Sequence, residues 1–264
     1  MDKVCIMSFN PTGLGLGKPE CIQNLLDTHH VDILLIQECW LFQSDLHKLG
    51  NIHKDYLFHG QSGMKDTVLL TGRPYGGIAI LWHKRLAASV SKVNECKSNR
   101  MCAVKFRCRN QNILLVNCYM PNDNYQKINV SDDFLQTCDA LECLISEFND
   151  CSVIVGGDIN LDYSRHNAHD QYFSHLLENC DMLDCWSLNV ARQDYTYCDH
   201  FQNTSCIDRF SVSTHMSHLV KEMYPIDCAL NTSYHRPICM TIEIEVQTSD
   251  NILSEKHSCN RFIA

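Results

Sequence analysis

The chain has 264 residues, of which 45% are hydrophobic, and 22 basic against 31 acidic side chains give a net charge of −9. This length and apolar content are ordinary for a globular protein with a sizeable core, as one large domain or two small ones. No apolar run approaches the length needed to cross a bilayer, which argues against a membrane protein. The acidic balance argues against a broad basic surface for nucleic acid, so action on phosphates would need a divalent metal and a local basic patch.

Seventeen cysteines are many for this length. The odd count, without a close C-x-x-C pair, argues against a zinc ribbon. Cys5, Cys118, Cys151 and Cys239 lie inside apolar runs, which favours reduced cysteines acting as small core residues in an intracellular protein. A disulfide-rich secreted domain is the alternative, and the N-terminus lacks the signal-peptide pattern that it would need.

The first elements predicted along the chain are a strand, a helix and a second strand. Residues 3–10 read as a strand and 11–17 as a glycine-rich turn that does not match the P-loop spacing. Residues 19–29 carry apolar side chains at helical spacing with a proline near the start. Residues 32–37 form an apolar strand. The order strand, helix, strand predicts an α/β unit.

Four strand-like segments come next, at residues 76–82, 87–93, 101–107 and 112–119. Residues 101–107 alternate in the manner of a half-exposed strand, whereas residues 112–119 are more apolar. Four strand-like segments in a row predict antiparallel pairing among them.

The second half of the chain mixes helices and strands. Ser131 has the character of a helix N-cap, with a helix expected through residue 148 and a buried strand over residues 152–160. Short helices are predicted at residues 169–180 and 182–189, and strands at 194–198, 206–213, 223–229 and 237–246. The absence of a linker favours one α/β domain over residues 1–246, followed by a polar tail over 247–264.

The strand at residues 152–160 ends in a group that suits a ligand. Asp158 and Asn160 lie two residues apart and follow Gly156 and Gly157, which remove side chains where the chain turns or a ligand approaches. A carboxylate and an amide presented together suit a cation, a water or a phosphate. The alternative is a plain strand followed by an Asx turn.

Two further polar residues stand out near the ends of apolar runs. Glu38 follows an apolar strand, where a carboxylate is poorly solvated unless it meets a cation, and oxygen ligation suits Mg²⁺. A solvent-facing glutamate is the alternative. His235 would be held in one tautomer by a carboxylate such as Asp208, although 13 other histidines compete and spacing alone does not select it.

Six local motifs, taken in order over residues 3–245, resemble those of the endonuclease/exonuclease/phosphatase superfamily. They are Ser8-Phe9-Asn10, Gln37-Glu38, Tyr119-Met120-Pro121-Asn122, Gly157-Asp158-Ile159-Asn160, Ile207-Asp208 and Ser233-Tyr234-His235. Residues 73–82 and Tyr195-Thr196-Tyr197 further resemble segments of the endonuclease domains of LINE-type (non-LTR) retrotransposons. Each motif alone is weak, but six in order are a strong signal.

The resemblance implies a four-layer, DNase I-like α/β (α+β) sandwich, in which two mostly antiparallel or mixed sheets pack face to face with helices on the outer faces. It also implies a phosphodiesterase that depends on Mg²⁺, with Mn²⁺ as an alternative, and a DNA substrate with no membrane partner. A reverse transcriptase follows this domain in the retrotransposons but has no counterpart in this sequence. The expected location is intracellular, in the nucleus, the cytoplasm or both.

The resemblance also implies a role for each matched position. Catalytic roles fall on Asp158, Asn160, His235, Asp208 and Tyr119, metal binding on Glu38 with Asn10 nearby, and substrate binding on Asn122 and Thr196. In these roles Asp158 and Asn160 position the attacking water and the phosphate, while His235, oriented by Asp208, stabilises charge or exchanges a proton. The sequence does not decide whether Asp158 or His235 takes the proton of the water.

The favoured hypothesis is a DNA-nicking endonuclease of retrotransposon origin that leaves a 3′-hydroxyl. An abasic-site nuclease, a lipid or inositol phosphatase and a non-catalytic binding module are the alternatives. Tyr234 is the main departure from the superfamily pattern, because it stands where the last motif has an aspartate. Tyrosine carries no negative charge near neutral pH, so we expect metal binding and activity to be weakened roughly 10- to 100-fold.

Overall fold

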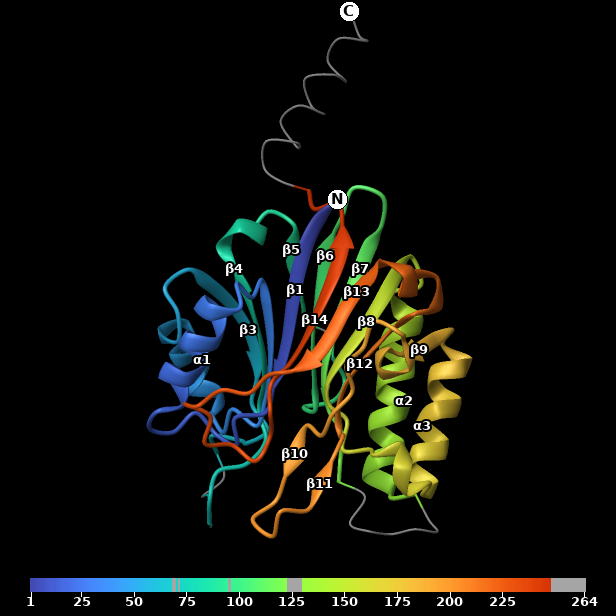
Figure 1. The fold of residues 1–264 in the computed structure, drawn as a ribbon. Coiled ribbons are helices and arrows are strands. Elements are labelled where there is room, and N and C mark those ends of the chain that lie inside the picture. Colours follow the sequence, from blue (N-terminus) through green and yellow to red (C-terminus); the bar gives the residue numbers. More distant parts are fainter. Residues whose placement is uncertain (68–69, 71, 95, 123–129, 248–264) are drawn as a thin grey trace, which may run out of the picture.

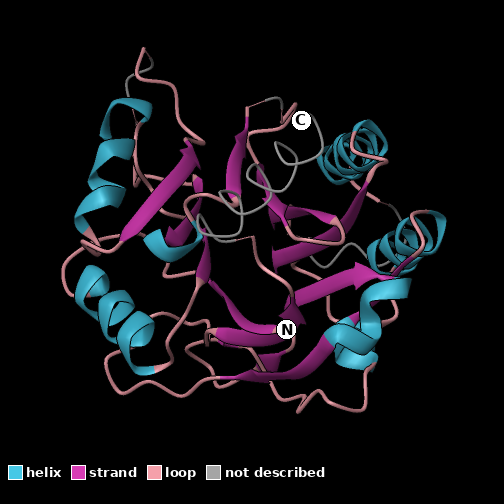
Figure 2. Ribbon diagram, turned by 90° about the horizontal axis from the view of Figure 1, so that it is seen from above, coloured by secondary structure: helices cyan, strands magenta, loops and turns pink. Residues whose placement is uncertain are grey.

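The computed structural model describes residues 1–67, 70, 72–94, 96–122 and 130–247. Two six-stranded sheets pack face to face, with helix α1 outside one sheet and helices α2 and α3 outside the other (Figures 1 and 2). The four-layer sandwich expected from the sequence is therefore confirmed. The division into a domain over 1–246 and a tail over 247–264 stays a prediction, since residues 248–264 lie outside the described range.

The first sheet has the strand order β13-β14-β1-β2-β4-β3. Its strands are β1 (Asp2–Phe9), β2 (Ile33–Gln37), β3 (Tyr56–Gln61), β4 (Ile78–His83), β13 (Val220–Pro225) and β14 (Ile238–Ile244). The second sheet has the order β5-β6-β7-β8-β12-β9. Its strands are β5 (Val90–Val93), β6 (Met101–Arg107), β7 (Asn112–Tyr119), β8 (Cys151–Asp158), β12 (Asp208–Ser213) and β9 (Met182–Asp184).

Each sheet contains one parallel pair of strands, and a helix makes each crossover. Helix α1 (Lys18–Thr28) joins the parallel strands β1 and β2, which confirms the predicted α/β unit. Helix α2 (Asp132–Glu147) lies between the parallel strands β7 and β8 in the chain. The other neighbours within the two sheets pair antiparallel. The carboxyl ends of β1, β2, β7 and β8 meet at one edge of the sandwich.

Apolar side chains fill three layers between these elements. The central layer lies between the sheets and includes Leu35 of β2 and Phe210 of β12. The outer face of the first sheet packs on α1, and the outer face of the second packs on α2 and on α3 (Ala168–Asn179). Because both faces of each sheet are covered, the central strands read as continuous apolar runs in the sequence.

Of the four strand-like segments expected in the middle of the chain, the last three pair antiparallel as predicted, as β5, β6 and β7, but two other expectations are wrong. Strand β4 pairs with β2 and β3 in the first sheet, whereas β5 begins the second sheet, so the four segments do not form one antiparallel set. The chain changes sheets through a short 3₁₀ helix, Lys84–Leu86, that shortens the strand expected at 87–93. Strand β6 is buried on both faces rather than half-exposed, since the first sheet covers its inner face.

The expectation of a helix at residues 182–189 is also wrong. Met182 and Leu183 pair with β12 as strand β9, and a 3₁₀ turn follows in which the Asp184 carboxylate accepts a hydrogen bond from the Trp186 backbone N–H. A run of this length is too short for its periodicity to separate a strand from a helix. Strand β3 and the 3₁₀ helix Gln43–Asn51 before it were not predicted from the sequence.

The remaining strands of the second half of the chain differ from the predicted ones only in the residues at which they begin and end. The expected strand at 194–198 reduces to β10 (Tyr197–Cys198), which forms a hairpin with β11 (Thr204–Ser205) that projects beyond the sheets (Figure 1). The strand expected at 223–229 lies earlier, as β13. Ser131 is the N-cap residue of α2 as expected, but its side chain makes no cap hydrogen bond.

Gly156 and Gly157 lie inside β8 rather than at a turn. A Cβ atom on Gly156 would come within 2.4 Å of the Phe210 ring, and one on Gly157 would lie 1.9 Å from the Cys118 carbonyl oxygen. Close packing between the sheets and between neighbouring strands therefore requires both glycines. They let β8 run deep in the sandwich and deliver Asp158 to its edge.

All cysteines that the structure describes are free thiols, and most are buried or partly buried. The expected use of cysteine as a small core residue agrees with this. Among the described residues, no helix is both long enough and apolar enough to cross a membrane.

Candidate active site

The candidate site lies at the sandwich edge from which the hairpin β10–β11 projects (Figure 1). Asn10 directly follows β1 and Glu38 directly follows β2, while Tyr119 and Asp158 end β7 and β8. Strand β12 and the segment before β14 reach the same edge because they run in the opposite direction. The site is thus built from both sheets.

The second sheet aligns three of these side chains on one rung. Asp158 lies opposite Tyr119 of β7 on one side and opposite Asp208 of β12 on the other. Directly opposed residues in neighbouring strands point to the same face of a sheet. Residues that are far apart in the sequence are therefore neighbours here for reasons of strand register.

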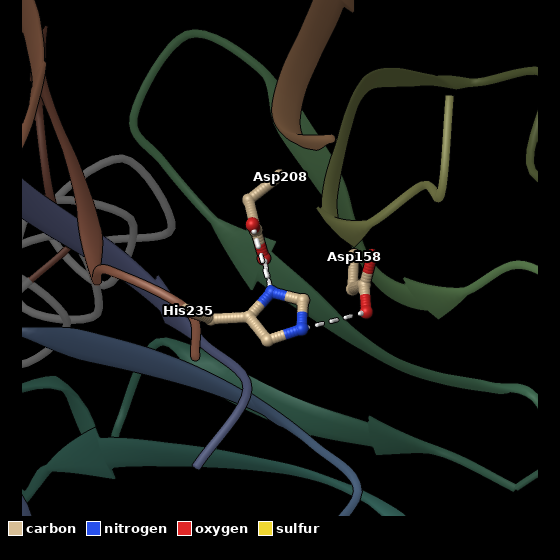
Figure 3. Close-up of side chains that lie close together, drawn as sticks. All are labelled: Asp158, Asp208 and His235. Carbon is tan, nitrogen blue, oxygen red and sulfur yellow. Dashed lines mark hydrogen bonds and ion pairs between the residues drawn. The ribbon is translucent and has the colours of Figure 1, made fainter. Parts of the chain in front are cut away.

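The imidazole of His235 lies between two carboxylates (Figure 3). Its Nδ1 is 3.0 Å from Asp208 Oδ2, and its Nε2 is 3.8 Å from Asp158 Oδ2. Burial opposes the charged form, but the Asp208 and Asp158 carboxylates outweigh it and raise the pKa of His235 to about 9. The structure brings together the predicted His235–Asp208 pair, and the imidazole is positively charged at neutral pH.

Asp158 is almost fully buried, at 1% exposure. Burial raises the pKa of its carboxyl to about 7, an effect that the neighbouring His235 partly offsets. Its Oδ2 accepts a hydrogen bond of 2.9 Å from Asn10 Nδ2. A carboxyl with a pKa near 7 exchanges protons readily at neutral pH.

Three neutral donors hold the carboxylate of Glu38 at the end of β2. Asn10 Nδ2 and Tyr119 Oη both donate to its Oε1, at 2.9 and 3.0 Å, and Trp40 Nε1 donates to Oε2 at 3.0 Å. Burial, followed by the charge of Glu38, raises the pKa of Tyr119, so its hydroxyl stays protonated as a donor. The side chain is therefore fixed in place by donors that carry no charge of their own.

The backbone around Glu38 is held in an unusual conformation. Glu38 and Trp40 have φ angles of +50° and +54°, in the left-handed region that costs free energy for residues with a Cβ atom. Hydrogen bonds from Cys39 N to Gly77 O (3.1 Å) and from Trp40 N to Gly76 O (2.9 Å) fix this segment. Strain that is held by its surroundings is common at functional sites.

The Asx turn considered for Asp158 and Asn160 is present. The Asn160 backbone N–H donates to Asp158 Oδ1 at 3.2 Å, and Asn160 has a φ angle of +57°. Its side-chain Nδ2 donates to the Met120 carbonyl oxygen at 2.8 Å. The turn is compatible with a ligand site, since both residues still line the cleft.

A buried polar network connects the two sheets beneath the site. Gln37 Nε2 donates to Asn117 Oδ1 at 2.6 Å and to Ser8 Oγ at 3.1 Å. The Asn117 amide of β7 also donates to the carbonyl oxygens of Ile36 and Ala79, at 2.9 and 2.8 Å. Because these groups are fully buried and satisfied, they fix one sheet relative to the other just below the catalytic candidates.

Two residues expected to bind substrate lie in different settings. Asn122 is exposed and lines the cleft, consistent with that expectation. Thr196 is fully buried, and its Oγ1 accepts hydrogen bonds of 3.0 Å from the backbone N–H groups of Ile207 and Asp208. A substrate cannot reach this hydroxyl, so the sequence-based expectation for Thr196 does not agree with its position.

The site opens into a cleft of about 410 Å³. Its described lining includes aromatic side chains and two arginines, which are Trp40, Tyr75, Tyr119, Tyr197, Tyr234, Arg73 and Arg165. Tyr234 is half exposed, at 50%, and lies on the rim beside His235. The departure from the expected aspartate therefore puts an aromatic ring at the entrance of the cleft.

Two residues that support the site, Trp40 and Ser233, were not predicted from the sequence. Trp40 carries no local pattern that would single it out, although it lies two residues beyond Glu38. The Ser233 hydroxyl donates to the Asn10 carbonyl oxygen at 2.7 Å and accepts from the His235 backbone N–H at 3.2 Å, which ties the His235 segment to β1. Ser233 is part of the last motif, so this motif was the available signal.

The two packed sheets with their outer helices form a DNase I-like sandwich, an architecture shared by nucleases and phosphatases. The sequence model of the endonuclease/exonuclease/phosphatase family matches residues 12–235, and the chain belongs to this family. No curated protein matches the chain.

Several solved structures share the fold over nearly the whole chain. The endonuclease domain of TRAS1, a telomere-specific non-LTR retrotransposon, is 17% identical with a TM-score of 0.69, and the match covers 92% of this chain and 99% of that one. The AP endonuclease LMAP from Leishmania major is 15% identical with a TM-score of 0.72, covering 91% and 88%. The 3′ phosphatase NExo from Neisseria, bound to a product DNA hairpin, is 20% identical with a TM-score of 0.69, covering 91% and 99%. At these identities the likeness concerns the fold.

Proposed function

We propose that this chain is a Mg²⁺-dependent phosphodiesterase, with Mn²⁺ as an alternative metal, and that it nicks DNA and leaves a 3′-hydroxyl. The observation that carries the proposal is the continuous hydrogen-bonded group from Glu38 through Asn10 to Asp158, with His235 and Asp208 next to it. In-line attack on a phosphodiester needs neutralised charge, an oriented water and help for the leaving oxygen, and this group supports each need.

The residues present fit a divalent cation at Glu38. Its carboxylate lines the cleft and is held by three neutral donors, and no described lysine or arginine forms an ion pair with it. A hard oxygen ligand of this kind, with Asn10 nearby, suits Mg²⁺. A bound metal would polarise the phosphate and stabilise the charge that develops on its oxygens.

Asp158 is the proposed acceptor of the proton from the attacking water. His235 has a pKa raised to about 9, so it is already protonated at neutral pH and cannot take a second proton. Asp158 has a pKa raised to about 7, close to the optimum for a general base at that pH. In this scheme His235 stabilises phosphate charge through its Nε2–H, and Asp208 fixes the imidazole through Nδ1.

The remaining site residues have supporting roles in the proposal. Tyr119 fixes Glu38 through its hydroxyl. Asn160 orients the phosphate from the cleft wall, and Asn122 contacts the substrate at the rim. Thr196 positions Asp208 by binding its backbone N–H.

A retrotransposon origin is supported by the local motifs and by the likeness to the TRAS1 domain. The substrate would then be DNA inside the cell, in the nucleus or cytoplasm, and related full-length elements would carry a reverse transcriptase. Abasic-site cleavage and phosphate release are alternative activities within the same family.

Nicking of supercoiled plasmid in the presence of Mg²⁺ or EDTA tests the proposal. Wild type should convert the plasmid to open circles only with metal, and Glu38→Gln or His235→Gln should reduce the rate roughly 100-fold or more. Glu178→Gln, an exposed change on α3, is the matched control and should leave the rate unchanged. Equal nicking in EDTA would refute the metal-dependent scheme.

A catalytically decayed binding module is the second candidate, and Tyr234 is the observation that favours it. In that case wild type should not nick DNA, whereas Tyr234→Asp should restore metal-dependent nicking by returning a carboxylate to the rim. Release of phosphate from small phosphoesters, without nicking by either form, would instead favour the phosphatase branch.

A further inference from the structure

Exposed aromatic rings border the cleft beside the catalytic candidates. Tyr75 and Tyr234 are 57% and 50% exposed, and both line the cleft. The Tyr197 ring lies 6.3 Å from the Tyr234 ring at an interplanar angle of 49°, and 4.9 Å from the His235 ring. A group of aromatic rings therefore lies next to His235, and the ring of Tyr234, the adjacent residue, is exposed to the cleft.

Backbone contacts hold the Tyr234 segment firmly. The Tyr234 carbonyl oxygen accepts a hydrogen bond of 2.9 Å from Cys198 N, and Arg236 N donates to the Thr196 carbonyl oxygen at 2.6 Å. Tyr197 and His235 form an antiparallel bridge between these contacts. The aromatic ring of Tyr234 thus projects from a rigid base, which reduces the entropy that a ligand must overcome on binding.

The charge distribution disfavours a long duplex as the ligand. Proteins that grip duplex DNA neutralise many phosphates with lysine and arginine, whereas this chain has a net charge of −9. The described part of the cleft lining contains two arginines, Arg73 and Arg165, and the Arg73 guanidinium lies over the Trp40 ring at 5.5 Å. Recognition must consequently draw on contacts that do not depend on net charge.

Base stacking on an aromatic ring is such a contact, and it needs a base whose face is free. In a duplex the neighbouring pairs cover both faces of each base, whereas unpaired nucleotides expose them. We infer that the cleft binds a phosphodiester next to an unpaired nucleotide, whose base stacks on Tyr234. This inference rests on the proposed phosphodiesterase function and names its substrate class as single-stranded, looped or frayed nucleic acid.

Direct binding in EDTA tests this inference without any need for turnover. The probes are a fluorescein-labelled DNA strand of about 12 nucleotides, a length within the usual single-strand site size, the same strand in a duplex, and the same strand with abasic positions throughout. Wild type should bind the intact single strand most tightly. Tyr234→Ala should weaken that binding roughly 5- to 100-fold and leave duplex and abasic binding unchanged, because stacking is lost only where a free base is present.

Two matched variants separate stacking from general damage. Tyr234→Phe keeps the ring and should retain the affinity of wild type for the single strand. Tyr172→Ala removes a tyrosine that is 37% exposed on α3, outside the cleft lining, and should change none of the three affinities. Circular dichroism of each variant checks that the fold is retained.

Several outcomes would overturn the inference. Equal losses for single strand and duplex in Tyr234→Ala would indicate a contact other than stacking, and so would tight binding of the abasic strand. Base-dependent binding by a chain that never cleaves would sustain the inference and refute the proposed hydrolysis. Cleavage that shows no strand preference and is unaffected by Tyr234→Ala would refute the inference and sustain the proposed hydrolysis.

Discussion

Two polar clefts at different places in the molecule contain the same kinds of residues but differ in how their charges are satisfied. The candidate active site and a second cleft of about 380 Å³, lined by Asp32, His53, His83 and Arg85 among others, both combine acids with histidines. In the second cleft, Asp32 accepts from Arg85 at 2.6 Å and from Cys5 N at 2.9 Å. The His53 imidazole is likewise engaged, with Asp27 at Nε2 and Asp55 N at Nδ1.

In the candidate active site, Glu38 lacks this local neutralisation, whereas Asp158 and Asp208 face the His235 imidazole. Glu38 meets neutral donors, and Asp158 is buried with the His235 imidazole 3.8 Å away. Among the described residues, Asp158, Asp208 and His235 form the one group of three potential metal ligands whose ligand atoms lie within 4.8 Å of one another. Residue types alone therefore do not mark a site, whereas a carboxylate that lines the cleft and is held by neutral donors, as Glu38 is, does.

The largest expected contrast between the clefts is in activity. Asp158→Asn should lower the rate of plasmid nicking by roughly 100- to 10,000-fold, because an amide cannot accept the proton of the attacking water. Asp32→Asn, in the second cleft, should leave the rate of the folded protein essentially unchanged. Comparable losses in both variants would show that the two clefts do not differ in function.

The next contrast is in the pH dependence of stability in EDTA. The pKa of His235 is raised from 6.5 to about 9, so its stabilising contribution is complete below pH 6.5 and is lost as the pH rises through 9. Urea unfolding should give wild type an advantage over His235→Gln that shrinks by about 3 kcal/mol between about pH 6 and about pH 10.

The second cleft supplies the control for this measurement. Burial raises the pKa of Tyr56, so its hydroxyl stays neutral and keeps donating to the Val31 carbonyl oxygen throughout this pH range. The advantage of wild type over Tyr56→Phe should therefore stay nearly constant. A His235→Gln difference that is equally flat would contradict the charged imidazole.

A smaller effect should distinguish the second cleft as a structural unit. Asp32→Ala removes the acceptor of the Cys5 backbone N–H and the partner of Arg85. It should therefore lower the free energy of unfolding by about 1 to 3 kcal/mol. Urea unfolding near neutral pH measures the change. An unchanged midpoint would mean that this ion pair has no structural role.

Metal-linked stability gives the smallest and most specific contrast. At a Mg²⁺ concentration roughly ten times the dissociation constant, binding should stabilise wild type by about 1.4 kcal/mol, or a few degrees in Tm. Glu38→Gln should abolish the shift and Asp32→Asn should retain it. A shift that survives in Glu38→Gln but disappears in Asp32→Asn would move the metal to the second cleft.

The sequence predicted those parts of the fold in which each element carries its own signal. Strands β1, β2, β7 and β8 are continuous apolar runs, and α1 and α2 have clear helical spacing. Short or partly exposed elements such as β3 and β9 were missed or misassigned, because their identity depends on pairing partners that are remote in the sequence. The change of sheets after β4 has no local signature at all.

The sequence motifs predicted which residues form the candidate site, but not how those residues are arranged in space. The order of the motifs located Glu38, Asp158 and His235, but the distances between them follow from strand register and from packing of the two sheets. Thr196 shows the limit of this reasoning, since a motif position turned out to be a buried hydrogen-bond acceptor. The role of Trp40 emerged only from its contact with Glu38.

The pairing of β1 with β14 constrains the order in which the molecule can assemble. Asp2 lies opposite Ile244 and Ser8 opposite Ile238. Strand β1 is synthesised early, so it can pair with β14 only after more than two hundred further residues have been synthesised. Contacts of such high sequence separation slow folding and expose unpaired strand edges in the meantime. His235 lies three residues before the start of β14, so the nascent chain acquires the imidazole of its proposed catalytic pocket only shortly before this sheet can close.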